Sequence, residues 1–267
     1  MKFQKAGWPH PKTLQEWFEL VKHDIYRYLS EFHSTGDRYL LGVKEKCRKF
    51  LEAIKEGDKE KMREAAEDCL LAVTWLHSFM IGAYKDLELP DEAFHLISSL
   101  SGDLRFAATE LIPQGKLGPE KAQVAEEHYM EKVNELVKFF SEGYRKHTAR
   151  FKQLLDDAEK RLNSVVNLMQ QEGWRTEDPE VIEPYKEELR NLYSSLRKLN
   201  NAVEEAGGDD LLPNAHFYLF NMLLNIEGLM RMDKVPFPEE NVATLKSVIM
   251  KALEAIRAVR EILEGRS

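Results

Sequence analysis

One stretch of the sequence constrains the fold more than any other, because residues 120–172 contain no proline and a single glycine, Gly143. Apolar, aromatic or imidazole side chains recur along this stretch at every third or fourth position. This stripe consists of Tyr129, Val133, Leu136, Phe140, Tyr144, His147, Phe151, Leu154, Ala158, Leu162, Val165 and Met169. Its steps average about 3.6 residues, the period of a nearly straight α-helix rather than of a coiled-coil seam. The sequence therefore predicts one long helix at about 119–172, either unbroken or interrupted near Gly143.

Prolines, glycines and capping residues mark the ends of the other expected helices. Thr13 with Glu16 is a capping box at a helix start, Gly36 is expected to end that first helix, and Gly57 with Asp58 predicts a tight turn in a helical hairpin. Besides the long helix, the expected helices cover residues 13–33, a second segment ending at 56, 58–86, 90–112, 184–205, 214–232 and 239–264. The predicted fold is all-α, with about eight helices in two abutting bundles, residues 1–112 and 179–267, that share the long helix at 119–172.

Composition places the chain among acidic helical proteins. There are 46 acidic and 38 basic residues, and the resulting net charge of -8 argues against a broad attraction to nucleic-acid phosphates or anionic lipids. The two cysteines, Cys47 and Cys69, lie on expected helices, so buried and reduced thiols are favoured over a disulfide scaffold. The longest uncharged runs are too short to span a membrane, and the first residues lack the apolar core of a secretory signal. We therefore expect a soluble, cytoplasmic protein that does not enter a membrane.

Two expected helices, residues 69–84 and 215–232, are apolar on nearly every side. A helix of this kind is normally surrounded by other helices, so we expect the two helices to form the centres of the two bundles. Six large side chains should then be almost completely buried: Trp75, Leu76, Phe79, Phe220, Leu223 and Leu224. A broad, solvent-exposed apolar face on either helix would instead indicate a surface for a partner.

Polar side chains within the same two helices are the candidate ligand-binding residues. They are His77 in the first helix and Tyr218, Asn221 and Asn225 in the second. A buried polar group without a partner costs about 1 to 3 kcal/mol, so these groups must be hydrogen-bonded. Their partners could be one another, which would fix helix packing, or a small molecule held in a pocket. The sequence leaves both alternatives open.

Carboxylates and histidines also recur at spacings that a metal site could use. The candidate ligands are Glu16, His23, Glu64, Asp68, Asp91 and His95. Their order, a carboxylate and histidine seven apart followed later by a pair four apart, resembles part of the ligand pattern of heme-oxygenase-like di-iron oxidases. That resemblance implies an all-helical di-metal oxidase. The residues themselves favour a different interpretation, because Glu16 and Asp91 are explained as capping residues, and we expect no metal and no cofactor.

Residues 46–70 form an expected helical hairpin that is similar to hairpins in HEPN-type nucleases and in translin-like proteins. Arg27 and His33, with five residues between them, resemble the arginine–histidine pair of HEPN domains. Glu64 and Glu67 resemble the Glu-x-x-Glu motif of translin-like nucleases. These resemblances imply a nuclease in which these four residues are the candidate catalytic residues.

One basic cluster could contact a nucleic-acid backbone. It contains Arg145, Lys146, Arg150 and Lys152 on the long helix. Acidic neighbours dilute its charge, which favours a solvated, ion-paired helix surface over nucleic-acid binding.

The function that the sequence favours is a non-catalytic α-helical interaction or assembly protein, a scaffold or accessory subunit that binds a protein partner or forms a homo-oligomer. The alternative is a helical-bundle enzyme or ligand-binding protein with its site between central helices, either di-metal oxidase-like or a HEPN- or translin-like nuclease. A filled core would agree with the first function, whereas a cavity lined by acids or imidazoles would agree with the second.

Overall fold

The computed structural model describes residues 13–169 and 179–231, and within these ranges the chain is helical with no strand. The predicted all-α class is therefore confirmed. The α-helices are α1 (Leu14–Glu56), α2 (Lys59–Leu87), α3 (Asp91–Phe106), α4 (Ala122–Met169), α5 (Pro179–Glu205), α6 (Gly208–Leu211) and α7 (Pro213–Met230). A π-helical turn at Ala107–Leu111 and a 3₁₀ turn at Pro119–Lys121 lie between α3 and α4. The helix expected at 239–264 lies outside the described residues.

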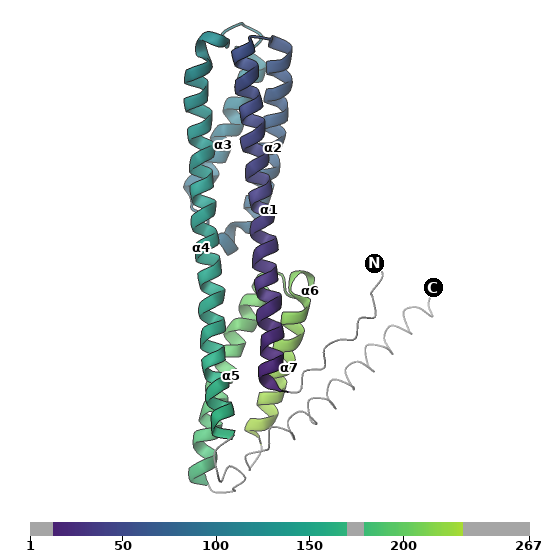
Figure 1. Ribbon diagram of the computed structural model, residues 1–267, viewed down its shortest axis with the longest axis vertical. Coiled ribbons are helices and arrows are strands. Elements are labelled where there is room, and N and C mark those ends of the chain that lie inside the picture. The colour runs from purple at the N-terminus through teal and green to yellow at the C-terminus, as the bar shows by residue number, and fades with distance from the viewer. Residues whose placement is uncertain (1–12, 170–178, 232–267) are drawn as a thin grey trace, which may run out of the picture. The chain divides into compact units, whose positions relative to one another are not determined.

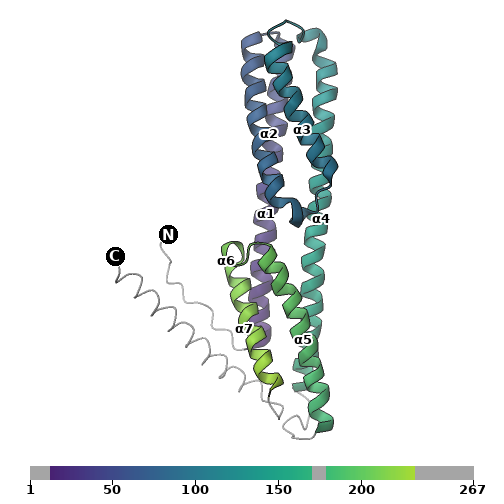
Figure 2. The same ribbon diagram turned by 180° about the vertical axis from the view of Figure 1, so that it is seen from behind.

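The chain divides into two compact units, and the division falls inside two helices rather than at loops. Unit 2 is Leu29–Arg150, a bundle in which parts of α1 and α4 pack with α2 and α3 (Figures 1 and 2). The described part of unit 1 is residues 13–28, 151–169 and 179–231, where α5 packs against α7. Both α1 and α4 therefore contribute to two cores, whereas the sequence assigned this role to α4 alone. Domain limits at 1–112, 119–172 and 179–267 stay a prediction.

Helix α4 is unbroken from Ala122 to Met169, as its periodic stripe predicts. Most members of that stripe are buried, including Val133, Leu136 and Phe140 in unit 2 and Phe151 in unit 1. Gly143 does not interrupt the helix. A Cβ atom at this position would lie 2.8 Å from the carbonyl oxygen of Leu87, so the glycine lets the C-terminal end of α2 approach the α4 backbone closely.

The first helix is longer than expected. The prediction that Gly36 ends it is wrong, because α1 continues through Gly36 to Glu56. Gly36 is buried, and a Cβ atom there would lie 2.1 Å from the hydroxyl oxygen of Tyr144 and 2.9 Å from the ring of Phe79. The absence of a side chain at Gly36 lets Tyr144 and Phe79 from other helices pack against the continuous helix α1. Similarly, α5 begins at Pro179, before the expected start at Pro184.

Local signals at the other helix ends behave as the sequence predicts. The Thr13 hydroxyl oxygen accepts a hydrogen bond from the backbone N–H of Glu16 (3.1 Å). Gly57 has a positive φ of 76°, and the Asp58 carboxylate accepts hydrogen bonds from the backbone N–H groups of Glu60 and Lys61. These contacts form the turn of the α1–α2 hairpin.

A buried carboxylate links two helices of unit 1. Asp24 on α1 is 2% exposed and accepts a hydrogen bond from the backbone N–H of Ala215 at 2.8 Å. Ala215 is in the first turn of α7, where backbone N–H groups have no partner within the helix, and a negative charge is favourable there. Arg27 pairs with the same carboxylate at 2.5 Å. Asp24 therefore caps α7 from a neighbouring helix.

The close approach at Gly143 generates a stability prediction. We expect Gly143→Ala to lower the free energy of unfolding by about 1–3 kcal/mol, because the new methyl group overlaps the Leu87 backbone. The matched control is Gly102→Ala on α3, where an added Cβ meets no atom within 4 Å and the helix propensity should add up to about 1 kcal/mol. Urea unfolding followed by circular dichroism measures both. Equal stabilisation by the two substitutions would contradict the close approach.

Candidate functional site

The expected burial of the two apolar helices is wrong for several residues. Leu76 is fully buried, but Trp75 is 57% exposed and Phe79 is only half-buried. In α7, Phe220 is 54% exposed, Leu223 is half-buried and Leu224 is 42% exposed. Helix α2 is flanked on both sides by described chain, so its exposed face is the better-defined candidate surface.

This candidate surface is the uncharged outer face of α2. Residues 69–84 carry no charge, and within them Leu71, Trp75, Ser78 and Gly82 follow at intervals of three or four residues and are all exposed. Such spacing places them on one side of the helix, opposite the buried residues Val73, Leu76 and Met80. We call the stripe of Leu71, Trp75, Ser78 and Gly82 the α2 outer face. It combines two large apolar side chains with two small residues.

The hydroxyl groups on this side of α2 are satisfied within the helix. Thr74 donates its hydroxyl hydrogen to the Leu70 carbonyl oxygen (2.8 Å), and Ser78 donates to the Thr74 carbonyl oxygen (3.1 Å). A Cβ atom at Gly82 would meet no atom within 4 Å, so the glycine leaves space open on the surface. The face therefore presents apolar contact area, and the hydroxyl hydrogens of Thr74 and Ser78 are already donated to backbone carbonyl oxygens.

An apolar hollow lies beside the α2 outer face. It has a volume of about 410 Å³ and is lined by Arg38, Tyr39 and Gly42 of α1 and by Ala72 and Trp75 of α2. Two of its five lining residues, Gly42 and Ala72, are small.

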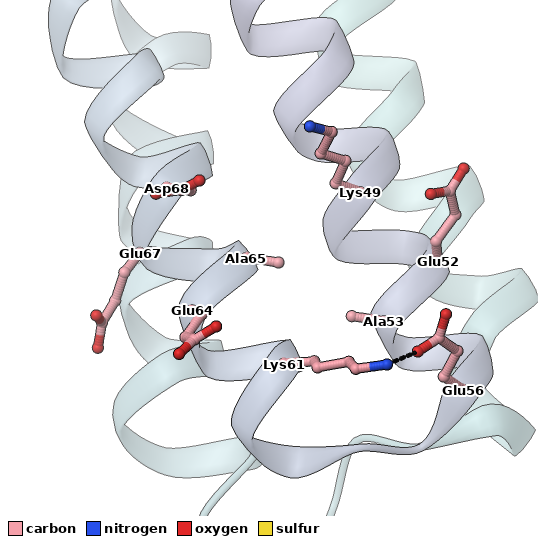
Figure 3. Close-up of a pocket in the computed structure, with 9 residues that line it drawn as sticks. All are labelled: Lys49, Glu52, Ala53, Glu56, Lys61, Glu64, Ala65, Glu67 and Asp68. Atoms are coloured by element: carbon pink, nitrogen blue, oxygen red, sulfur yellow. Dashed lines mark hydrogen bonds and ion pairs between the residues drawn. The ribbon is translucent and has the colours of Figure 1, made fainter.

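A second hollow between the same two helices, of about 460 Å³, lies nearer the α1–α2 turn (Figure 3). The small side chains of Ala53 and Ala65 point toward one another across it. Charged side chains surround them: Lys49, Glu52, Glu56, Lys61, Glu64, Glu67 and Asp68. Lys61 donates to Glu56 at 2.8 Å, and Asp68 accepts from Lys46 at 2.5 Å. Five carboxylates and two lysines in the lining make this hollow acidic.

The candidate ligand-binding residues lie in different compact units. His77 is half-buried in unit 2, with its ring 6.2 Å from that of Phe94. In unit 1, Tyr218 is buried with its ring edge-to-face against Trp17, and the Asn221 side-chain amide donates to the Phe217 carbonyl oxygen of its own helix (2.7 Å). Asn225 is half-buried on α7. A ligand pocket at these residues stays a prediction.

The residues proposed as metal ligands are not brought together. His23 and His95 are exposed, and Asp68 pairs with Lys46. Within residues 13–169 and 179–231, no group of three or more histidine, cysteine, aspartate or glutamate side chains is arranged to hold a metal ion. Glu16 acts at the helix start through its backbone N–H, which donates to the Thr13 hydroxyl oxygen. Asp91 lies in the first turn of α3, but the capping position is occupied by Pro90 and no side chain caps this helix, so the predicted capping role of Asp91 is wrong.

The residues that resemble nuclease motifs form two pairs, one on α1 and one on α2. Arg27 pairs with the Asp24 carboxylate, whereas His33 contacts His147 and Tyr144. Glu64 and Glu67 both line the acidic hollow, and Glu67 also pairs with Arg63 at 3.5 Å. A nuclease function of these residues stays a prediction.

In the basic cluster of α4, two of the four residues interact with one acid. Arg145 and Lys146 both pair with Glu142, at 3.9 and 3.6 Å. This ion pairing agrees with the interpretation of a solvated helix surface.

A pair of histidines that the sequence did not single out as a site lies in the core of unit 2. The Nε2 atom of His33 is 3.3 Å from Nδ1 of His147, and the His33 ring packs on Tyr144 with their centroids 4.3 Å apart. His147 is 1% exposed. Burial, with smaller effects from His33 and Arg150, lowers the pKa of His147 to about 4, and burial also lowers the pKa of His33. Both imidazoles are therefore neutral at pH 7.

The two cysteines meet across the α1–α2 hairpin. Cys47 and Cys69 are completely buried free thiols with their Sγ atoms 2.8 Å apart. The contact with Cys47, together with burial, raises the pKa of the Cys69 thiol. Because the thiolate is the nucleophilic form, this environment makes the pair unreactive. Their predicted burial is confirmed.

Comparison with known proteins identifies no relative: no family model, curated protein or solved structure matches this chain. Among the described helices, none has the length and apolar character needed to cross a membrane.

The His33–His147 pair generates a pH prediction. The folded state holds His147 neutral down to about pH 4, whereas an unfolded histidine takes up its proton near pH 6.5, so stability must fall as the pH falls between these values. We expect this group to remove about 2 kcal/mol of stability at pH 5 relative to pH 7. Urea unfolding at the two pH values, with His147→Leu as the control that cannot titrate, measures the effect. An identical pH dependence in the variant would refute it.

The buried thiols generate a second prediction. In the native protein, Cys47 and Cys69 should react with a disulfide reagent such as DTNB only as fast as the core opens, and both should react at once in denaturant. A Ser78→Cys variant adds an exposed thiol on α2 as a fast-reacting control. Immediate labelling of two thiols in the native protein would show that the pair is accessible.

Proposed function

We propose that this chain is a non-catalytic interaction or assembly protein, and that the α2 outer face is its docking surface. One observation carries the proposal: a helix without charge over sixteen residues leaves Leu71 and Trp75 more than half exposed. Large exposed apolar patches on a folded chain are typical of interaction surfaces.

The chemistry of the face supports the same function. Burial of a large apolar side chain is worth about 1.5–3 kcal/mol, and tryptophan is among the residues that dominate protein interfaces. Trp75 lines an apolar hollow together with the small residues Gly42 and Ala72, which let a partner approach. The hydroxyl groups of Thr74 and Ser78 already have acceptors in their own helix, so covering them would leave no donor unsatisfied.

Affinity purification of the tagged chain from its own cells tests this function. We compare the wild type with Trp75→Lys, using Val124→Lys on α4 as the control, because Val124 is 65% exposed and outside the proposed surface. A second, differently tagged copy of the chain is expressed in the same cells. Quantitative mass spectrometry should show a co-purifying protein that decreases at least tenfold with Trp75→Lys and is unchanged with Val124→Lys.

Circular dichroism must first show that both variants fold, which we expect because both side chains point to solvent. The absence of any protein, the second copy included, whose co-purification depends on Trp75 would disprove the docking function.

A further inference from the structure

The exposed side of α2 changes character along its length. Near the start of the helix, the side that continues the α2 outer face carries the exposed residues Glu60, Glu64, Glu67 and Asp68. The same turns of the helix also expose Lys59, Lys61 and Arg63. The uncharged stripe from Leu71 to Gly82 continues directly from the acidic residues. One side of the helix is therefore acidic in its first half and apolar in its second half.

Helix α1 reinforces this division. It contributes Lys49, Glu52 and Glu56 to the acidic hollow, and Arg38, Tyr39 and Gly42 to the apolar hollow. Some of the acidic charge is paired, since Lys61 binds Glu56, Lys46 binds Asp68 and Arg63 binds Glu67. Glu52 and Glu64 are exposed in the lining of the acidic hollow, which therefore offers carboxylate oxygens to a partner.

The two hollows between α1 and α2 suit a helix. Ala53 and Ala65 face each other in the acidic hollow (Figure 3). Gly42 and Ala72 line the apolar hollow. Small residues let the backbones of packed helices approach closely, and an amphipathic helix in an apolar groove is a common mode of recognition. From Glu60 to Gly82 the surface extends for about 33 Å, the length of a helix of about 20 residues.

We propose, resting on the docking function above, that the occupant is an amphipathic helix of another protein with lysine or arginine along one half of its contact face. The basic half lies against Glu52 and Glu64, and the apolar half covers Leu71 and Trp75. The charges fix the orientation of the helix, and the apolar contacts hold it.

A second copy of the chain fits this surface less well. On its exposed side, α2 carries a single lysine in its C-terminal half, Lys85, against four carboxylates in its first half. Two copies packed in parallel would bring carboxylates together, and two antiparallel copies would set Lys85 of α2 and Arg38 of α1 against the five carboxylates of each acidic hollow.

Designed peptides test the inference on the full-length protein. The probe is a dye-labelled helical peptide of about 20 residues with leucine in one half of its contact face and four lysines in the other. The lysines are placed in the N-terminal half or in the C-terminal half, and a second pair of peptides carries four glutamates instead. Fluorescence anisotropy should show that one lysine peptide binds at least tenfold more tightly than its glutamate counterpart, and that Trp75→Lys weakens it at least tenfold.

Two double variants distinguish attraction to the carboxylates of the acidic hollow from attraction to the overall negative charge of the protein. We expect Glu52→Lys with Glu64→Lys to weaken the lysine peptide at least tenfold and to strengthen the glutamate peptide. The control, Glu131→Lys with Glu135→Lys on the exposed side of α4, changes the net charge equally and should leave the preference intact.

Three outcomes would overturn the inference. Equal weakening by the two double variants would indicate attraction to the whole acidic protein, and equal binding of both peptides would remove the charge preference. Sedimentation at twice the 31.0 kDa mass of the chain, lost in Trp75→Lys, would identify a second copy as the occupant. In each of these cases, a protein whose co-purification depends on Trp75 would still support the docking function.

Discussion

The continuous apolar stripe of α4 is the constraint on which both units depend. Most of the stability of a helix in a protein comes from packing of its apolar face rather than from intrinsic propensity, so each part of α4 must bury its stripe against neighbours. Phe140 does so in unit 2, and Phe151 does so in unit 1. Helix α1 likewise buries Phe18 in unit 1 and Phe50 in unit 2. Two cores thus share two helices, and the shorter helices complete each core.

The parts of the fold that the sequence predicts are those that depend on neighbouring residues in the chain. The phase of α4, the hairpin turn at Gly57 and the cap at Thr13 are all local. The prediction at Gly36 fails because a glycine in a helical sequence serves two purposes. It can end a helix, or it can let another element approach, and only the positions of Tyr144 and Phe79 decide between them.

Polar groups inside the cores were harder to predict. Asp24 is surrounded in sequence by the core residues Val21, Ile25 and Tyr28, so a carboxylate in phase with a buried stripe was the available signal. Its partner, the N-terminal turn of α7, is nearly two hundred residues away in sequence and could not be inferred. The stripe did predict the burial of His147, but its contact with His33 depends on how α1 and α4 pack.

Helix α2 shows what an uncharged sequence does and does not determine. A helix without charges predicts contact with apolar partners, but it does not say whether those partners belong to the same chain. Within the described residues, the inner side of α2 is buried, while Trp75 faces solvent and Gly82 has no neighbour that requires a glycine. A glycine inside a helix costs about 1 kcal/mol relative to alanine. That cost is offset where a second helix packs on this side, because the missing side chain lets it approach. The proposed docking function therefore accounts for features of α2 that the packing of its own unit leaves unexplained.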